Sequence, residues 1–275
     1  MKISVIIPSR KRVRGLSATL TTLDRLSSKK HEITYGICCD LDDLETQDFC
    51  KEIQKEIPLA YKTGERPKSL GSLYNGMAEL MPADLYFLLV DDMLCLTPDW
   101  DDIAAKAAEE TPHGVFFWSH ATNDALWAII AEKWRKAADC LFTDHYPFWY
   151  DDLAMVEQYA MATGEQIQKL PIIAHDTPGK THRMRDLPFW NDFFLFTRQW
   201  RVERGKEIAK NLGIVEPLIG EELLKLLNKE WCCPPKEYLE QIEANQGDKS
   251  EPDANYLASK KRAEIWMETG RDPWN

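Results

Sequence analysis

The chain has 275 residues, of which 44% are hydrophobic and 29% are charged, as is typical of a globular protein. Asp and Glu outnumber Lys and Arg by 45 to 34, which gives a formal net charge of −11. This balance disfavours non-specific binding to nucleic acid or anionic lipid, although a local basic patch could still bind an anion. No apolar run reaches the roughly 18 residues of a membrane span, and the N-terminal apolar run is too short for a secretory signal. We therefore expect a soluble, cytoplasmic protein.

The first third of the chain alternates between β-rich runs and helical patterns. The pattern predicts strands at 2–9, 33–40, 59–63 and 84–92, separated by helices at 16–26, 41–57 and 70–81. Such alternation is typical of a parallel sheet with helices on both faces. Sheets of this kind bind ligands beyond the carboxyl ends of their strands.

The pattern is looser beyond residue 92. Further strands are predicted at 115–120, at 125–131 and in a last strand ending at His175, with helices at 98–110, 132–142 and 150–164 and a helical or mixed stretch at 187–213. From about Pro217 the sequence is charged and helical, with polar breaks. We predict a main domain over residues 1–215 and a small helical C-terminal extension over 216–275.

Polar residues follow three of the predicted strands, namely Pro8-Ser9-Arg10, Asp40 and Asp91-Asp92. The last pair ends an apolar run, and two adjacent buried carboxylates repel unless a cation or another partner compensates them. Neighbouring strand residues point to opposite sides, so Asp91 and Asp92 can serve different partners. Oxygen ligands suit Mg²⁺ and Mn²⁺, whereas the simpler alternative is a pair that caps a turn.

Six segments, in order, resemble family 2 glycosyltransferases of the GT-A (Rossmann-like) fold. They are ISVIIPSRKR, GICCDLDD, GSLYNGMAE, LYFLLVDDMLCLTPDWDD, HYPFWYDDLAMVEQYAMATG and IIAHDTPGKTHRMRD, and they cover roughly residues 1 to 200. The resemblance implies a mostly parallel sheet flanked by helices. It also implies a hexosyl- or pentosyltransferase that uses a nucleoside-diphosphate sugar.

The resemblance also implies roles for single residues on the nucleotide side. Pro8 and Ser9 match the strand end that lines the nucleotide pocket. Asp40 matches an aspartate that accepts a hydrogen bond from the uracil ring N–H, and Asp91 matches a residue that faces the ribose. A UDP-sugar is therefore the favoured donor, while a dTDP-sugar stays open because thymine offers the same ring N–H.

Metal binding and catalysis are implied in the same way. Asp92 matches the ligand of a Mn²⁺ or Mg²⁺ ion that bridges the diphosphate, and His175 matches a histidine that completes the metal site or contacts the diphosphate. Asp152, next to Asp151, matches the general base, and direct attack with such a base implies inversion. The plain alternatives are that the Asp151-Asp152 pair caps a helix and that His175 is a packed or surface histidine.

Basic residues near the predicted diphosphate pocket form a further class of candidates. They are Arg10, Lys11, Arg12 and Arg14 after the first strand, Arg66 and Lys68 before the helix at 70–81, and Lys180, His182, Arg183 and Arg185 after His175. Each is either an anion-binding residue or part of a solvated loop.

The acceptor and two competing functions stay open at this point. A Gln-x-x-Arg-Trp motif and membrane spans, which processive synthases of the family carry, are not found, so we expect transfer of single sugars. The acceptor could be a saccharide or glycolipid precursor, a small molecule, a protein or a hydroxymethylated DNA base in a phage-type reaction. The alternatives are a non-catalytic sugar-nucleotide-binding module and a nucleotidyltransferase, which fits poorly because residues 8–15 contain a single glycine.

Overall fold

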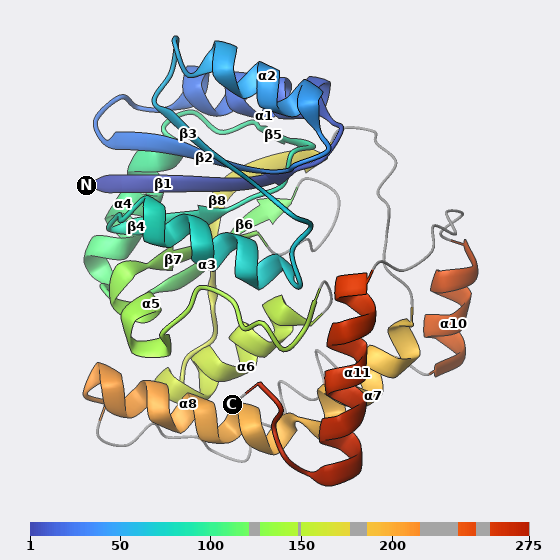
Figure 1. Ribbon diagram of the computed structural model, residues 1–275. Coiled ribbons are helices and arrows are strands. Elements are labelled where there is room, and N and C mark those ends of the chain that lie inside the picture. The colour runs from blue at the N-terminus through green and yellow to red at the C-terminus, as the bar shows by residue number, and fades with distance from the viewer. Residues whose placement is uncertain (121–126, 148–149, 177–185, 215–235, 246–253, 275) are drawn as a thin grey trace. The chain divides into compact units, whose positions relative to one another are not determined.

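The computed structural model describes residues 1–120, 127–147, 150–176, 186–214, 236–245 and 254–274 (Figure 1). Two compact units are present, and both are discontinuous in sequence. Unit 1 comprises Met1–Pro67, Leu73–Leu141 and Ile167–Gly179, and unit 2 comprises Lys68–Ser72, Phe142–Gln166 and Lys180–Asn275. The domain boundary expected after residue 215 falls in the range 215–235, outside the described residues, and stays a prediction.

Unit 1 is built on an eight-stranded sheet with the order β3-β2-β1-β4-β7-β6-β8-β5. The strands are β1 (Lys2–Ser9), β2 (Glu32–Asp40), β3 (Leu59–Gly64), β4 (Leu85–Leu88), β5 (Met93–Cys95), β6 (Val115–His120), β7 (Ala128–Ala131) and β8 (Gln168–Asp176). The pairings of β1 with β2, β1 with β4, β2 with β3 and β6 with β8 are parallel. The predicted α/β fold with a mostly parallel sheet is therefore confirmed.

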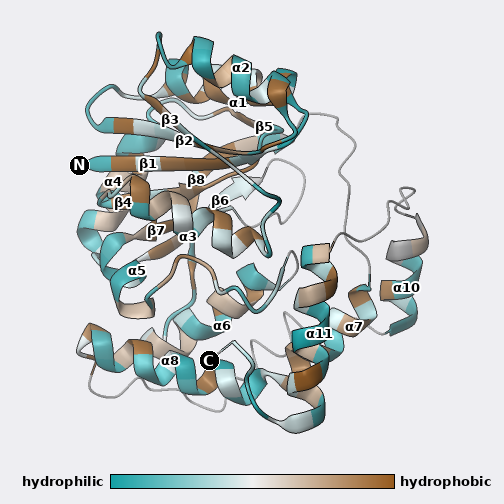
Figure 2. Cartoon of the chain, in the orientation of Figure 1, coloured by the Kyte–Doolittle hydropathy of each residue, from teal (hydrophilic) through white to brown (hydrophobic). Residues whose placement is uncertain are grey.

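Helices α1, α2 and α4 cover one face of this sheet. The helices of the region are α1 (Val13–Leu26), α2 (Leu44–Ile53), α3 (Leu70–Leu80), α4 (Trp100–Glu110) and α5 (Glu132–Ala138). Alternate residues of β1, such as Val5 and Ile7, enter one core cluster with Leu20 of α1 and Trp100 of α4. Figure 1 shows α3 on the opposite side of the sheet from α1 and α2, and Figure 2 shows that β1 is largely hydrophobic along its length. Burial of both faces explains why β1 reads as a continuous apolar run.

The fourth predicted strand is shorter than expected. β4 ends at Leu88, although the Leu89 N–H still donates to Ile6 O at 3.0 Å. Asp91 and Asp92 then form a turn, and β5 follows at once and pairs antiparallel with β8. The carboxylates therefore lie in a turn beyond the strand rather than on the strand itself.

Unit 2 is helical. Its helices are α6 (Asp151–Thr163), α7 (Leu187–Phe196), α8 (Arg198–Leu212), α10 (Lys236–Asn245) and α11 (Ala254–Thr269). The stretch predicted at 187–213 is two helices that meet at Thr197, whose hydroxyl donates to Phe193 O at 2.8 Å. An aromatic core that includes Tyr146, Trp190 and Trp266 joins these segments. No helix among the described residues is long and apolar enough to cross a membrane.

A buried ion pair fixes α6 against α8. Arg201 of α8 is 1% exposed, and its Nε donates to Glu157 Oε2 of α6 at 2.6 Å. The guanidinium also donates to the Tyr146 hydroxyl at 2.9 Å and lies over the Phe194 ring, 3.6 Å from its centroid. Such a pair is costly to break because one buried charge would lose its partner. It holds in place the helix that begins with Asp151.

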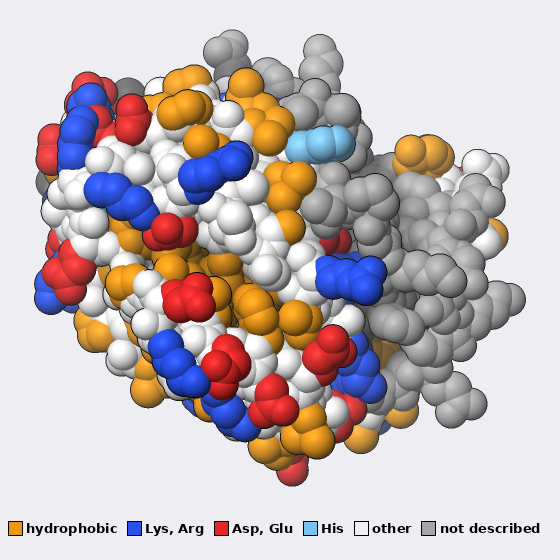
Figure 3. Space-filling view, turned by 90° about the horizontal axis from the view of Figure 1, so that it is seen from above, with side chains coloured by type: hydrophobic (Ala, Val, Ile, Leu, Met, Phe, Trp, Pro, Cys, Tyr) orange, Lys and Arg blue, Asp and Glu red, His pale blue; other side chains and the backbone are white. Residues whose placement is uncertain are grey.

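The surface carries charges of both signs. Figure 3 views the molecule from the side of α1 and α2 in Figure 1, and acidic and basic side chains alternate there around small hydrophobic areas. Among the described residues of this face, Lys and Arg do not gather into one broad patch. The anion-binding candidates therefore have to be judged by their local contacts.

Candidate active site

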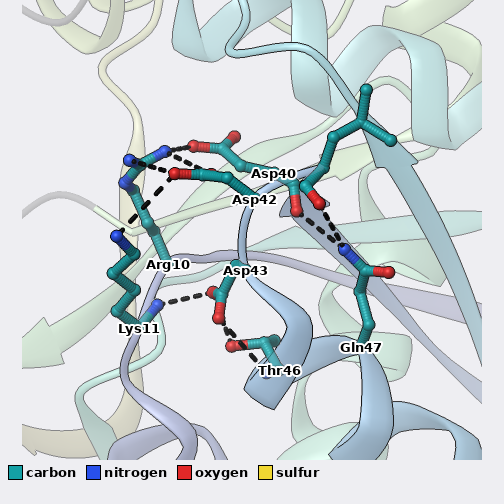
Figure 4. Close-up of polar contacts among 8 residues, drawn as sticks. Arg10, Lys11, Asp40, Asp42, Asp43, Thr46 and Gln47 are labelled. Atoms are coloured by element: carbon teal, nitrogen blue, oxygen red, sulfur yellow. Dashed lines mark hydrogen bonds and ion pairs between the residues drawn. The ribbon is translucent and has the colours of Figure 1, made fainter.

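The loop between β1 and α1 has an unusual backbone. Lys11 lies in the left-handed region with φ 54°, which is uncommon for a residue with a side chain. Its backbone N–H donates to Asp43 Oδ2 at 2.6 Å, and Asp43 also caps α2 by accepting from the Thr46 N–H at 3.2 Å (Figure 4). The loop is thus tied to the start of α2, and Arg10 and Arg12, on either side of Lys11, reach different carboxylates.

Arg10 binds the carboxylates at the end of β2. Its guanidinium forms an ion pair with Asp40 and donates to both oxygens of Asp42, at 3.2 and 3.1 Å (Figure 4). Gln47 Nε2 donates to the backbone oxygen of Asp40 at 3.1 Å and holds the strand end in place. Asp40 therefore lies where the sequence predicts it, and Arg10 is its direct neighbour. Sequence reasoning identified both residues but did not predict their pairing.

Arg12 binds the second pair of carboxylates. Its Nη1 lies 3.1 Å from Asp91 Oδ1 and 2.6 Å from Asp92 Oδ2, while the Ser9 hydroxyl donates to Asp91 Oδ2 at 2.8 Å. Asp91 is 5% exposed. Burial raises the pKa of Asp91 more than Ser9 and Arg12 lower it. Burial lowers the pKa of Arg12, but the two carboxylates raise it more, so the net shift is upward.

These contacts lie at a special point in the sheet. β1 lies between β2 and β4 in the sheet. After β1 the chain adds β2 and β3 on one side of it and then crosses to add β4 on the other side, so the strand order reverses at β1. Pro8 and Ser9 end β1 opposite Cys38 and Cys39 of β2, and the Ser9 contact with Asp91 connects β1 to the turn after β4. In open α/β sheets the crevice at such a switch point is the usual ligand site.

Two residues that sequence reasoning did not assign hold this turn in place. A Cβ atom on Gly15 of α1 would lie 2.5 Å from the Asp91 carbonyl oxygen, so only glycine allows this approach. The Tyr74 hydroxyl of α3 donates to Leu89 O at 2.8 Å. In the sequence, the only sign of this contact is a glycine, Gly15, near the start of a predicted helix. The sequence does not show that Gly15 lies against the Asp91 carbonyl oxygen.

His175 lies one strand away from the carboxylate turn. It pairs with Leu94 in the antiparallel β5–β8 ladder, two positions beyond Asp92, and its side chain is exposed. No group of three or more His, Cys, Asp or Glu residues in the described part of the chain is arranged to hold a metal ion. Asp91 and Asp92 nevertheless hold a cationic group, the Arg12 guanidinium, at hydrogen-bond distance. This donor set fits a hard divalent cation whose remaining ligands are substrate oxygens.

Arg66 and Lys68 lie before α3, as predicted. Arg66 is half-buried and Lys68 is exposed. Ser69 caps the helix, since its Oγ accepts from the Ser72 N–H at 2.9 Å. The Lys68 backbone oxygen accepts a hydrogen bond from Ser259 Oγ at 3.2 Å, and the Lys68 ammonium group takes no part in this bond. A role for either residue in anion binding stays a prediction.

The second pair of aspartates begins α6 in unit 2. Asp151 Oδ1 accepts from the Asp152 N–H at 3.0 Å, and Asp152 Oδ1 accepts from the Leu153 N–H at 2.8 Å. Asp151 is 5% exposed, and its Oδ2 has no hydrogen-bond partner among the described residues. Both carboxylates thus contact amides of the first helical turn, as a capping role requires, but one oxygen is buried without a partner.

Burial makes this pair hold protons tightly. Burial and the neighbouring charge of Asp152 raise the pKa of Asp151 to about 8, and burial also raises the pKa of Asp152. No positively charged group of the described residues contributes to either shift. A carboxyl pair in this state can accept and release protons near neutral pH.

Neither a protein-family model nor a curated protein sequence matches the chain. Solved structures do match its fold. S. aureus TarS 1–349 in complex with UDP-GlcNAc matches with a TM-score of 0.57 and 11% identity, over 98% of this chain and 93% of that chain. The mannosyltransferase PcManGT from Pyrobaculum calidifontis, in complex with GDP-Man and Mn²⁺, matches with a TM-score of 0.55 and 10% identity, over 97% and 87% of the two chains. Both are glycosyltransferases with a GT-A-like fold, and this chain has that fold.

Proposed function

We propose that the protein is a glycosyltransferase that moves a sugar from a nucleoside-diphosphate sugar to a hydroxyl acceptor. The observation that carries this proposal is the polar cluster at the switch point of unit 1, where Ser9, Arg12 and the Asp91-Asp92 turn meet. The same fold holds UDP-GlcNAc in TarS and GDP-Man in PcManGT. A ligand site is expected at this edge of the sheet on topological grounds alone.

Binding of the donor is assigned to unit 1. Pro8 and Ser9 would line the nucleotide pocket, and the Asp40 carboxylate at the end of β2 would accept the uracil ring N–H, which favours a UDP-sugar. Asp91 would accept a ribose hydroxyl. Arg10 already lies beside Asp40, so it is placed to contact the nucleotide as well.

The diphosphate requires positive charge. Asp92 and His175 would hold Mn²⁺ or Mg²⁺, since His175 lies on β8, which pairs with the strand that follows Asp92. When bound, the ion would stabilise the negative charge of the leaving diphosphate. Arg66 and Lys68 would add to this stabilisation from the loop before α3. PcManGT is seen with Mn²⁺, which supports the use of a divalent ion on this fold.

Proton transfer is assigned to Asp152 of unit 2. Its carboxylate would take the proton of the acceptor hydroxyl as the acceptor oxygen bonds to the anomeric carbon and the bond from that carbon to the diphosphate oxygen breaks. Direct attack of this kind inverts the anomeric centre. Asp151, with a pKa raised to about 8, would keep its proton at neutral pH and limit the repulsion between the two carboxyl groups.

Thermal unfolding in the presence of nucleotides tests the proposal. UDP, GDP, dTDP and CDP are each added with MnCl₂ or with EDTA, and UMP serves as a control that lacks the second phosphate. We expect UDP with Mn²⁺ to raise the melting temperature by several degrees, because a ligand that binds only the folded state stabilises it. UMP should have little effect. If none of the diphosphates raises the melting temperature under either condition, the proposed function is wrong.

A further inference from the structure

The cation at the Asp91-Asp92 turn is a side chain of the protein itself. The Arg12 guanidinium lies within 3.1 Å of Asp91 Oδ1 and 2.6 Å of Asp92 Oδ2, and the side chains of the three residues are 21%, 8% and 19% exposed. A guanidinium does not lose its proton in a protein. The three side chains together therefore carry one net negative charge instead of two.

The backbone around Arg12 is fixed on both sides of the residue. Lys11 is held by Asp43, and the Arg12 carbonyl accepts from the Leu16 N–H at 2.9 Å in the first turn of α1. The guanidinium is at the end of a long side chain that starts from this anchored backbone. Arg12 can therefore exchange one anionic partner for another without any change in the fold of the loop.

We propose that Arg12 is a built-in competitor of the divalent cation, so that the ion binds Asp92 tightly only together with a nucleoside diphosphate. An ion that approaches Asp92 Oδ2 meets a positive group that already contacts this oxygen, and the two positive charges repel. A diphosphate offers Arg12 other anionic oxygens and gives the ion further ligands. Metal and nucleotide then favour each other's binding, and the coupling is reciprocal. This inference rests on the proposed donor site at Asp92.

Direct measurement of Mn²⁺ binding tests the inference. The free Mn²⁺ signal in electron paramagnetic resonance gives its affinity for the wild type and for Arg12→Gln, each with and without UDP. We expect weak binding of Mn²⁺ alone to the wild type and binding that is at least about tenfold tighter with UDP, as for typical couplings between sites. Arg12→Gln should bind Mn²⁺ alone about tenfold more tightly than the wild type, and UDP should add less. Equal Mn²⁺ affinity of the two proteins without UDP overturns the inference.

Two variants separate the charge of Arg12 from other effects. Arg25→Gln removes the same charge from an exposed position in the last turn of α1 at which no ion pair forms with the described residues, and its Mn²⁺ affinity should stay within about twofold of the wild type. Arg12→Lys keeps the charge and should also bind Mn²⁺ weakly. Tight binding of Mn²⁺ by Arg12→Lys would show that side-chain shape, not charge, controls the site, and would overturn the inference.

Loss of Arg12 leaves the buried Asp91 carboxylate without its cation, so Arg12→Gln could fail to fold. The double variant Asp91→Asn/Arg12→Gln avoids this problem and is compared with Asp91→Asn alone. Removal of Arg12 should again tighten Mn²⁺ binding, and no change would contradict the inference. Failure of the proposed function looks different, because then no nucleoside diphosphate raises the melting temperature of any variant. If UDP binds but Mn²⁺ affinity is unaffected by Arg12, only the inference fails.

Discussion

The protein has two pairs of adjacent aspartates that are similar in sequence but differ in their surroundings. In unit 1, Asp91 and Asp92 share the Arg12 guanidinium, and Ser9 donates to Asp91. In unit 2, each aspartate of the pair at the start of α6 accepts a backbone N–H, and one oxygen of the first has no partner among the described residues. Among the described residues, a positively charged group compensates the first pair and none compensates the second.

The difference shows that the neighbours of a carboxylate, rather than its sequence motif, decide its chemistry. In the first pair the carboxylates can exchange the Arg12 guanidinium for a metal ion, and the guanidinium can then bind a diphosphate. The buried pair in unit 2, which has no cationic partner in the described part of the chain, holds protons instead, and the pKa of Asp151 is raised to about 8. We therefore expect substitutions at the two pairs to change different measurements.

The largest effect is expected at Asp152. Asp152→Asn removes a proton acceptor of similar shape, so the rate of UDP release from the best donor should fall by about 10²- to 10⁴-fold. The thermal shift with UDP and Mn²⁺ should remain, because donor binding is assigned to unit 1. Asp192→Asn, which changes an exposed aspartate of α7, is the control and should keep the rate. A rate that stays near that of the wild type would indicate that Asp152 only caps α6.

The stability of unit 2 should depend on pH through Asp151. The pKa of Asp151 in the folded state is raised to about 8, well above the ordinary value of an Asp side chain, so at neutral pH the folded protein holds a proton that the unfolded chain has lost. The contribution of Asp151 to the free energy of unfolding is fully present below about pH 4. It is lost as the pH rises towards 8, at a rate on the order of 1 kcal/mol per pH unit. Asp151→Asn does not titrate and should be more stable than the wild type at pH 8, with a smaller difference at pH 5. Urea unfolding from pH 5 to 9 measures this change, and parallel curves for the two proteins would refute it.

The sequence predicts the parallel core of the sheet and most of its helices because these signals are local. β1 and β2 are β-rich runs that end at Ser9 and Asp40, within one residue of the expected bounds. The resemblance to GT-A glycosyltransferases rests on these same strand ends, and the fold is confirmed. The roles assigned to the individual site residues stay predictions.

The features that the sequence does not predict depend on contacts between distant segments. β5 has three residues and is held by β8, whose Ala174 pairs with Cys95. The contacts of Arg12 depend on the left-handed backbone of Lys11. A lysine at this position does not indicate that conformation, because glycine or asparagine is the usual residue there. The raised pKa of Asp151 depends on the burial of α6 among later helices, and a single-sequence pattern contains no measure of that burial.

A smaller effect is expected from a methyl group placed under the turn of the first aspartate pair. The Cβ of Gly15→Ala would lie 2.5 Å from the Asp91 carbonyl oxygen, so the turn must shift, at a cost of about 1 to 3 kcal/mol in the free energy of unfolding. We expect weaker Mn²⁺ binding in the presence of UDP, measured by electron paramagnetic resonance.

Gly205→Ala in α8 is the matched control for this substitution. Its Cβ would lie 2.5 Å from Met161 Cβ of α6, which is an equally close approach but within unit 2. This variant should lose stability in the same range while its Mn²⁺ and UDP affinities stay unchanged. If both glycine variants weaken Mn²⁺ binding equally, loss of stability rather than displacement of the carboxylate turn explains the effect.

The smallest effect is expected at Lys11, whose left-handed backbone separates Arg10 from Arg12. Lys11→Gly should change the free energy of unfolding by less than about 1 kcal/mol, because relief of strain and loss of chain stiffness oppose each other. Lys11→Ile should destabilise the protein by roughly 1 to 2 kcal/mol and also alter Mn²⁺ affinity, since a β-branched residue avoids positive φ and would move Arg12. Lys29→Ile places the same strain at φ 61° after α1 and should lower stability without a change in Mn²⁺ affinity. If Lys29→Ile changed Mn²⁺ affinity as much as Lys11→Ile, the loop would not be what positions Arg12 on the first aspartate pair.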